Sequence, residues 1–334
     1  MQLLSKIKMK TAALHFFLFS LLLLLFLIDL LIGSAGFSPL SDLFNNSEFS
    51  VVFWQFRWPR VLTAITCGVA LSLSGLIMQV LFRNPLAGPY VLGISSGATL
   101  GVALLVLGGY MLGFHGSESG FLLIIFASIG ALSVLFVVSW TASFIRDFMT
   151  VLIMGVILGS FIGAFVQVLE FLAPDAMLRS FVHWGMGSLQ GVTPSQIPWL
   201  VVVTLLGALV AVLAIPVMNL MLLNEAYVSS TGLNIAKSRL ILMIVGGVLA
   251  GSVTAFCGPI GFVGIAVPHL ARMFYNTGNH QAIVPGSIAI GGIFMICCDM
   301  CSFLGSDGVL LPVNAVTAVL GTPIIVWLIL KRKS

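Results

Sequence analysis

The chain has 334 residues and a formal net charge of +4, and apolar side chains dominate it: 60% of its residues are hydrophobic and only 7% are charged. With a mean hydropathy of +1.18, it has too little polar surface to coat a water-soluble domain of this length. The composition therefore excludes a soluble protein and predicts a polytopic membrane protein. The positive charge is interpreted as a topology signal that faces membrane lipid, so no nucleic-acid partner is expected.

Apolar runs of about 20 residues, the length of a helix that crosses a hydrocarbon core, recur along the whole chain. They predict an all-α fold with about ten transmembrane helices in a single domain, 1–334. The eighth run is too short to span a membrane unaided, and such a break is tolerated only where protein or a water-filled path surrounds it. The predicted spans are 11–33, 59–81, 91–112, 121–142, 150–172, 196–217, 240–257, 259–271, 282–301 and 312–330.

Orientation follows from the Lys and Arg residues near the ends of the predicted helices. With both termini placed in the cytoplasm, eleven of the fourteen lie on the inner side and three, Arg57, Arg60 and Arg179, lie on the outer side. Because outer loops normally avoid positive charge, these three arginines are expected to serve a partner.

The sequence lacks the motifs of several enzyme classes. It contains no G-x-x-x-x-G-K-[ST] phosphate loop, so the chain is not expected to hydrolyse ATP alone, and neither H-E-x-x-H nor G-x-S-x-G occurs. Cys298 and Cys301 form a C-x-x-C, but an apolar helix without a second such pair favours packing over a metal site. We therefore predict a protein that is not an enzyme and that has neither a cofactor nor a metal site.

Ion-coupled secondary transport is an alternative, and it usually needs an acidic residue deep in the bilayer. The candidates Asp29, Glu170 and Asp299 all fall near the outer ends of predicted spans. A carboxylate at a helix end is more often hydrated or paired than involved in transport, so ion-coupled transport stays the less favoured alternative.

Glycines recur every four residues in the fifth predicted span, at Gly155, Gly159 and Gly163. They leave one face on which another backbone can pack closely. Ser160 and Gln167 in the same span are polar, and polar groups inside a membrane usually line a bundle or a path. We therefore expect this span to line a translocation path.

Several segments are similar to the signature sequences of the FecCD-type permeases, the membrane subunits of ABC importers for iron-siderophores, haem and vitamin B12. The similar segments are Arg57–Arg60, Leu81–Ala87, Leu92–Ala98, Gly258–Arg272 and Leu311–Thr317. The resemblance covers nearly the whole chain and implies a type II ABC importer permease fold in the bacterial inner membrane. It also implies two ATP-binding subunits inside, a second permease copy or a paired homologue, and a periplasmic or lipid-anchored substrate-binding protein outside.

The resemblance assigns the outer arginines a role. Pro59 suits the first turn of a helix, which places Arg57 and Arg60 one turn apart at the outer mouth of the second span. In the resembled family this R-x-P-R pair meets acidic groups of the binding protein, so both side chains are predicted to be exposed for docking. Anchoring to lipid phosphates or to a carboxylate such as Glu48 is the alternative.

One position departs from the resembled family. Many members carry a further arginine just after the ninth span, where this chain has Phe303. The docking surface is therefore expected to differ in charge. Arg179 is a candidate replacement, and pairing with Asp175 at i, i+4 is the alternative for it.

On the inner side, the resemblance implies a gate at the Asn84-Pro85-Leu86 turn, with Asn84 and Leu86 as the gate residues. Pro85 forbids continuation of the helix, so a plain turn is the alternative. The family's contact with the ATPase falls between the sixth and seventh spans. The matching residues in this chain are Glu225, Ser229, Gly232 and Asn234.

The tenth span carries Asn314 and Thr317 three residues apart, and these join Ser160 and Gln167 as predicted path residues. His269 invites a haem-ligand assignment, but its place in a motif shared by permeases for different cargo favours a structural role. The function predicted from the residues and the resemblance is uptake of an iron chelate, a siderophore complex or haem, by alternating access. Vitamin B12 remains the alternative cargo.

Overall fold

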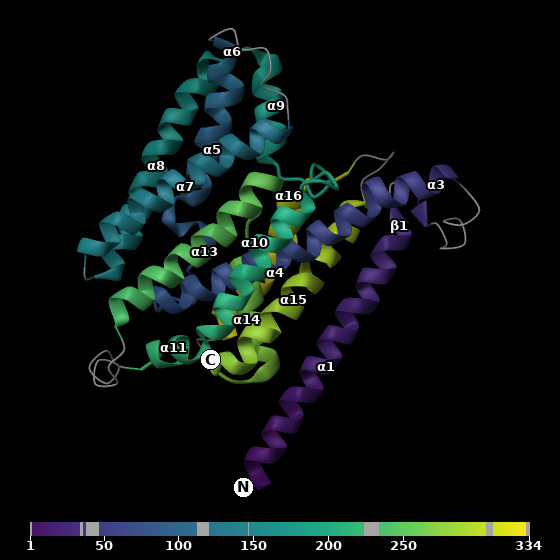
Figure 1. The fold of residues 1–334 in the computed structure, drawn as a ribbon, viewed down its shortest axis with the longest axis vertical. Coiled ribbons are helices and arrows are strands. Elements are labelled where there is room, and N and C mark those ends of the chain that lie inside the picture. Colours follow the sequence, from purple (N-terminus) through teal and green to yellow (C-terminus); the bar gives the residue numbers. More distant parts are fainter. Residues whose placement is uncertain are drawn as a thin grey trace.

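The computed structural model describes residues 2–33, 36–37, 47–111, 120–145, 147–223, 234–304 and 310–331. These residues form helices almost throughout, and the two strands are two residues each and pair with one another (Figure 1). The elements are α1 Gln2–Leu31, β1 Ile32–Gly33, β2 Gly36–Phe37, α3 Ser47–Val52, the π-helical turn η1 Phe53–Arg57, α4 Trp58–Leu81, the 3-10 turn η2 Pro89–Leu92, α5 Ile94–Ala103, the π-helical turn η3 Leu104–Gly108, α6 Gly109–Met111, α7 Gly120–Phe144, α8 Phe148–Leu172, α9 Asp175–Gly185, α10 Ile197–Leu213, α11 Ile215–Met221, α13 Ile235–Cys257, α14 Val263–Tyr275, α15 His280–Ser302 and α16 Val313–Lys331.

The all-α polytopic fold is confirmed, and each predicted span coincides with a helix or a run of helices. Within the described residues, six helices are long and apolar enough to cross a membrane, or seven if the pair α10 and α11 counts as one span. That pair bends by 57°. The bend has a local cause, because Pro216 lies in the first turn of α11 and cannot donate the hydrogen bond that would continue α10.

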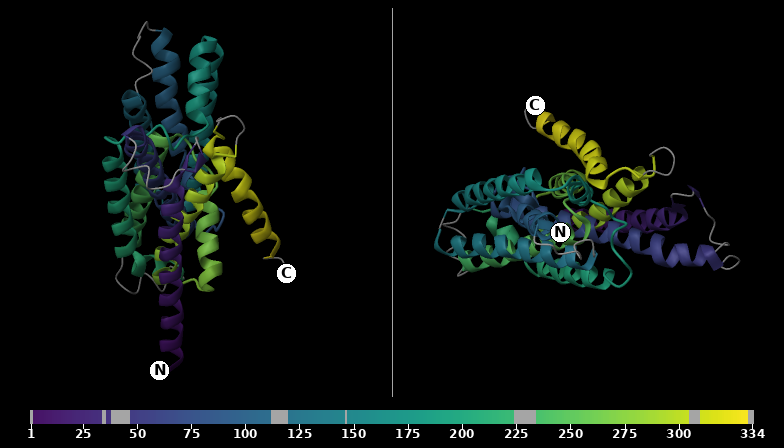
Figure 2. Two further views of the ribbon diagram at one scale, coloured as in Figure 1. Left: turned by 90° about the vertical axis from the view of Figure 1, so that its right-hand side faces the viewer. Right: turned by 90° about the horizontal axis from the view of Figure 1, so that it is seen from above.

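Figure 1 places α6 and α9 at one end of the bundle, here called the outer end, and α11 at the opposite, inner end. Figure 2 shows the start of α1 projecting past the other helices at the inner end and α16 leaning away from the bundle. α9 is an additional helix that the hydropathy pattern does not predict, since it is short and carries charged side chains.

Helix α4 is the centre of the packing, and 89% of the residues in the apolar stretch that it contributes are buried inside the protein. Small residues allow its neighbours to approach. The backbone of α15 at Gly291 lies directly against Gly68, and the backbone of α14 at Gly264 lies against Gly75. Lipid tails are as apolar as the surfaces of the helices, so the hydrophobic effect contributes little to helix association in a membrane. Helices there usually associate through close backbone contact at small residues.

The glycine face of α8 packs inside the chain. A Cβ added at Gly155 would meet the backbone of Leu92, and one added at Gly159 would meet the backbone of Gly93, whereas one added at Gly163 would have no neighbour within 4 Å among the described residues. The close approach of another backbone, expected from the spacing of these glycines, is confirmed at the first two positions. The opposite face of α8 points away from this chain.

The break between α13 and α14 is formed by 258–262, where Gly258 has a φ of +74° and Phe262 a φ of +67°. Backbone groups that leave helical geometry at membrane depth need other partners. Asn314 Oδ1 accepts from the Gly261 N–H at 2.9 Å, and the Tyr90 hydroxyl accepts from the Ile260 N–H at 3.3 Å. The predicted break is therefore confirmed, and protein groups satisfy it.

Candidate functional site

An ionic cluster at the outer end joins three helices that are far apart in the sequence. Arg60, in the first turn of α4, lies 2.8 Å from Asp299 (Nε to Oδ2) and 3.4 Å from Asp29 (Nη2 to Oδ1). Asp29 is 0% exposed, Asp299 2% and Arg60 4%. The 2.8 Å contact is a close ion pair without hydrogen-bond alignment, since both of its atoms lack a hydrogen-bond partner. The two helix-end carboxylates are thus paired, as expected.

The Arg60 guanidinium also caps the C-terminal end of α1. Arg60 Nη2 donates to the carbonyls of Ile32 at 3.0 Å and Asp29 at 3.2 Å. Arg57 Nη1 donates to the carbonyl of Leu31 at 3.0 Å and reaches that of Leu30 at 3.4 Å. The last carbonyls of a helix have no intrahelical donor, and cations near a helix C-terminus are favourable.

The prediction that Arg57 and Arg60 stand exposed is therefore wrong: each is only 4% exposed within the single chain. The physical reason is that α1 ends beside α4 and offers orphan carbonyls and a carboxylate, which the sequence alone could not place there. Docking through these two guanidinium groups would require their internal contacts to break.

Phe303 lies directly on this cluster. Its ring centroid is 4.3 Å from the central carbon of the Arg60 guanidinium, which is a cation–π contact. An aromatic ring here stabilises the cation, whereas a second arginine would repel it. Arg179 is exposed on α9, and the described residues contain no ion pair between it and Asp175.

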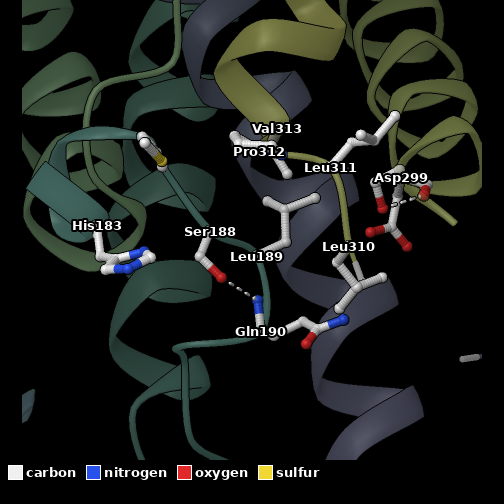
Figure 3. Close-up of a pocket in the computed structure, with 12 residues that line it drawn as sticks. His183, Ser188, Leu189, Gln190, Asp299, Leu310, Leu311, Pro312 and Val313 are labelled. Atoms are coloured by element: carbon white, nitrogen blue, oxygen red, sulfur yellow. Dashed lines mark hydrogen bonds between the residues drawn. The ribbon is translucent and has the colours of Figure 1, made fainter. Parts of the chain in front are cut away.

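A cavity of about 170 Å³ adjoins the cluster (Figure 3). Such a volume holds a few waters and is smaller than the roughly 300–1,000 Å³ of typical ligand pockets, so it does not accommodate a metal chelate. Sequence reasoning missed this cavity because it is assembled from three separate segments. Its lining comprises His183, Met186, Gly187, Ser188, Leu189, Gln190, Asp299, Ser302, Leu310, Leu311, Pro312 and Val313.

At the inner end, the turn that follows α4, 82–87, has the geometry expected from Asn84 and Pro85. Arg83 has a φ of +47°, and Asn84 Oδ1 accepts from the Leu86 N–H at 2.9 Å, which is an Asx-type turn. Asn84 thus uses its side chain to form the turn, whereas Leu86 is 46% exposed. His269 Nε2 donates to the Pro85 carbonyl at 2.8 Å, a contact that accounts structurally for this histidine.

Of the four residues predicted to contact the ATPase, the structure describes only Asn234. Glu225, Ser229 and Gly232 lie outside the described residues. Asn234 caps α13, because its Oδ1 accepts from the Lys237 N–H at 3.0 Å.

The four predicted path residues separate into two pairs. Ser160 and Gln167 are exposed on α8, and Ser160 Oγ donates to the carbonyl of Val156 in its own helix. Thr317 is 0% exposed, so its predicted place on a path is wrong. The reason is that this side of α16 packs on the 258–262 break, where the Asn314 side chain is also engaged.

The described residues offer little for a metal ion. No three His, Cys, Asp or Glu side chains among them gather closely enough to hold one. Cys67 of α4 and Cys257 of α13 do meet, with their sulfurs 3.4 Å apart, and both are buried.

Comparison with known proteins matches the arrangement to one family. Residues 21–331 match the model of the FecCD transport family. The chain is 32% identical to the vitamin B12 import system permease protein BtuC of Citrobacter koseri over 94% of this chain and 92% of that protein. It is 32% identical to the hemin transport system permease protein HmuU of Yersinia pestis, over 93% and 95%.

The fold agrees with these matches. An inward-facing structure of a metal-chelate type ABC transporter superposes with a TM-score of 0.83 and 29% identity, covering 96% of this chain and 99% of that one. The chain therefore belongs to the FecCD transport family and is a membrane-spanning permease subunit of an ABC importer.

Proposed function

We propose that this permease moves an iron chelate, a siderophore complex or haem, across the bacterial inner membrane. The observation that carries the proposal is the similarity over 96% of the chain to a metal-chelate type transporter. The relatives are named for hemin and for vitamin B12, and each of these ligands is a large organic molecule around a metal. Vitamin B12 is therefore the second candidate cargo.

The chain works with partners in this proposal. The sequence contains no phosphate loop, so two separate ATP-binding subunits supply ATP hydrolysis and contact the inner segment 224–239. A second permease copy covers the exposed face of α8, and a substrate-binding protein delivers cargo at the outer end. Alternating access then opens the path to one side at a time.

The ionic cluster supports the proposed orientation, with both termini in the cytoplasm. Two of the three outer basic residues, Arg57 and Arg60, are engaged by Asp29, Asp299 and the end of α1. Their charge is thus compensated within the protein and does not oppose the positive-inside rule.

The test is uptake by the full complex in proteoliposomes, with ferric siderophore, haem and cobalamin supplied separately. We expect accumulation of one cargo only when ATP is enclosed with the ATP-binding subunits, and no ATP hydrolysis by the permease alone. Uptake driven by an ion gradient without ATP would support the secondary-transporter alternative instead. Preference for cobalamin would replace the cargo while keeping the mechanism.

A second test addresses the path. Ser160 is exposed on α8, so Ser160→Trp should block uptake by filling the passage while the complex with the ATP-binding subunits still forms. The matched control is Leu205→Trp, at a position that is 63% exposed on α10. Normal uptake by the Ser160 variant, or failure only through loss of the complex, would show that α8 serves packing and that the route lies elsewhere.

A further inference from the structure

Two buried cysteines from helices far apart in the sequence meet inside the bundle. Cys67 lies in the outer half of α4, and Cys257 is the last residue of α13. Their sulfurs are 3.4 Å apart, and the two residues are 0% and 3% exposed. Both are free thiols. Two nucleophilic groups are thus in direct contact, each carried by a different helix.

A disulfide between these two residues would need little movement. It holds its sulfurs about 2.05 Å apart, so the pair would close by roughly 1.4 Å. Helix α4 is poorly able to supply this movement, because the backbone of α15 lies against Gly68, the residue next to Cys67. Helix α13 ends at Cys257, and Gly258 follows with a φ of +74°. Oxidation would therefore draw the end of α13 toward α4, together with the start of the 258–262 break.

The thiol pair lies next to a cavity that small solutes fit. Ser188 lines the cavity of about 170 Å³ at the outer end (Figure 3), and its backbone N–H donates to the Cys257 carbonyl at 2.8 Å. A cavity of this size holds a few waters, and hydrogen peroxide is uncharged and only slightly larger than water. Burial of both thiols excludes bulky or charged oxidants. The pair is therefore placed to react with peroxide rather than with larger oxidants.

We propose that Cys67 and Cys257 form a peroxide-sensitive thiol pair, whose oxidation to a disulfide joins α4 to α13 and slows transport. One thiol sulfur attacks a peroxide oxygen, the O–O bond breaks, and a sulfenic acid and one water form. The second thiol then attacks the sulfenic sulfur, so that the S–S bond forms and a second water leaves. Overall, the two thiols lose two electrons and two protons, and one hydrogen peroxide becomes two waters.

The inference rests on the proposed function, in which the cargo is an iron chelate. Iron that enters a cell reacts with hydrogen peroxide to give hydroxyl radicals, so slower import during peroxide exposure limits damage. Alternating access requires helices to move against one another, and a covalent bond prevents α4 and α13 from separating where the break begins. Buried thiols react slowly, so the pair responds to sustained exposure rather than to traces of peroxide.

The experiment uses the full complex in proteoliposomes. It is incubated with hydrogen peroxide, the excess is removed with catalase, and cargo uptake with ATP is measured. A parallel sample is treated with N-ethylmaleimide to block free thiols, and its unreduced peptides are analysed by mass spectrometry. We expect a peptide pair linked through Cys67 and Cys257, a loss of uptake in proportion to the linked fraction, and recovery of uptake with dithiothreitol.

Cysteine variants separate this pair from the other thiols of the complex. Cys67→Ser and Cys257→Ser should transport as the parent does before treatment and should keep their uptake after peroxide. Cys67→Ala, which keeps the site apolar, takes their place if the serine variants do not assemble. The matched control replaces Cys298 and Cys301 with serine, leaves the proposed pair intact, and should respond to peroxide as the parent does.

The outcomes distinguish the thiol pair from the proposed function. Absence of the linked peptide, or equal loss of uptake in the parent and in the Cys67 and Cys257 variants, would overturn the inference. It would also be overturned if the linked peptide formed while uptake stayed unchanged, or if a link between Cys298 and Cys301 accounted for the loss. An untreated complex that transports no iron chelate with ATP would contradict the proposed function, whereas the linked peptide is measured independently of transport.

Discussion

Replacing Arg60 with methionine is expected to destabilise the folded permease by about 3–5 kcal/mol, because Asp29 and Asp299 would remain buried without their counter-charge. Both carboxylates are at most 2% exposed, so bulk water does not replace the guanidinium, and only the small adjoining cavity offers water to Asp299. The melting temperature of the purified protein in detergent should fall by on the order of 10 °C. This effect arises within one chain, so it requires no binding protein.

Two further variants test the assignment. The printed bonds of Arg57 go to the backbone carbonyls of Leu30 and Leu31, so Arg57→Met should cost less than Arg60→Met, about 1–2 kcal/mol. Adding Asp29→Asn and Asp299→Asn to the Arg60 variant removes the uncompensated charge and should recover more than half of the lost stability. If Arg60→Met melts like the parent and loses only affinity for the binding protein, docking rather than internal pairing is its main role.

Charge reversal at Arg60 also tests the internal ion pairs of this residue rather than docking. Arg60→Glu would place a third carboxylate beside Asp29 and Asp299, and loss of folded protein is then the expected result. A loss of uptake in such a variant would not by itself identify a docking surface. Arg179, which is exposed on α9, is the cleaner position for charge reversal at the outer end.

Hydropathy alone predicted the helices well because membrane spans must satisfy their backbone internally and are long and apolar. It could not predict the 57° bend between α10 and α11 or the helix α9. The bend leaves the apolar run uninterrupted, since Pro216 is only one residue within it. α9 is short and amphipathic, so its residues resemble a polar connection.

The sites were harder to predict because they depend on contacts between distant segments. Asp29 and Asp299 could each be recognised as helix-end carboxylates, yet only the packing of α1 and α15 on α4 shows that both meet Arg60. The burial of Thr317 similarly depends on the course of the 258–262 break. By contrast, the turn at Asn84 and Pro85 is a local feature, and its geometry followed from the sequence.

Gly75→Leu should prevent α4 from packing against α14 and abolish the yield of monodisperse protein. A Cβ at this position would overlap the Gly264 carbonyl group and its Cα, which are backbone atoms that cannot rotate away. Overpacking a well-filled core already costs about 1–3 kcal/mol when side chains can adjust, and here two helices would have to separate. Size-exclusion profiles of the detergent-solubilised protein provide the measurement.

Gly163→Leu is the matched control, since no described atom of this chain lies within 4 Å of the Cβ that it adds, and it should leave the single chain folded. A normal profile for the Gly75 variant would show that α14 can move away from α4 at little cost. The contact at Gly75 thus determines how closely α14 and α4 pack, and with it the stability of the core.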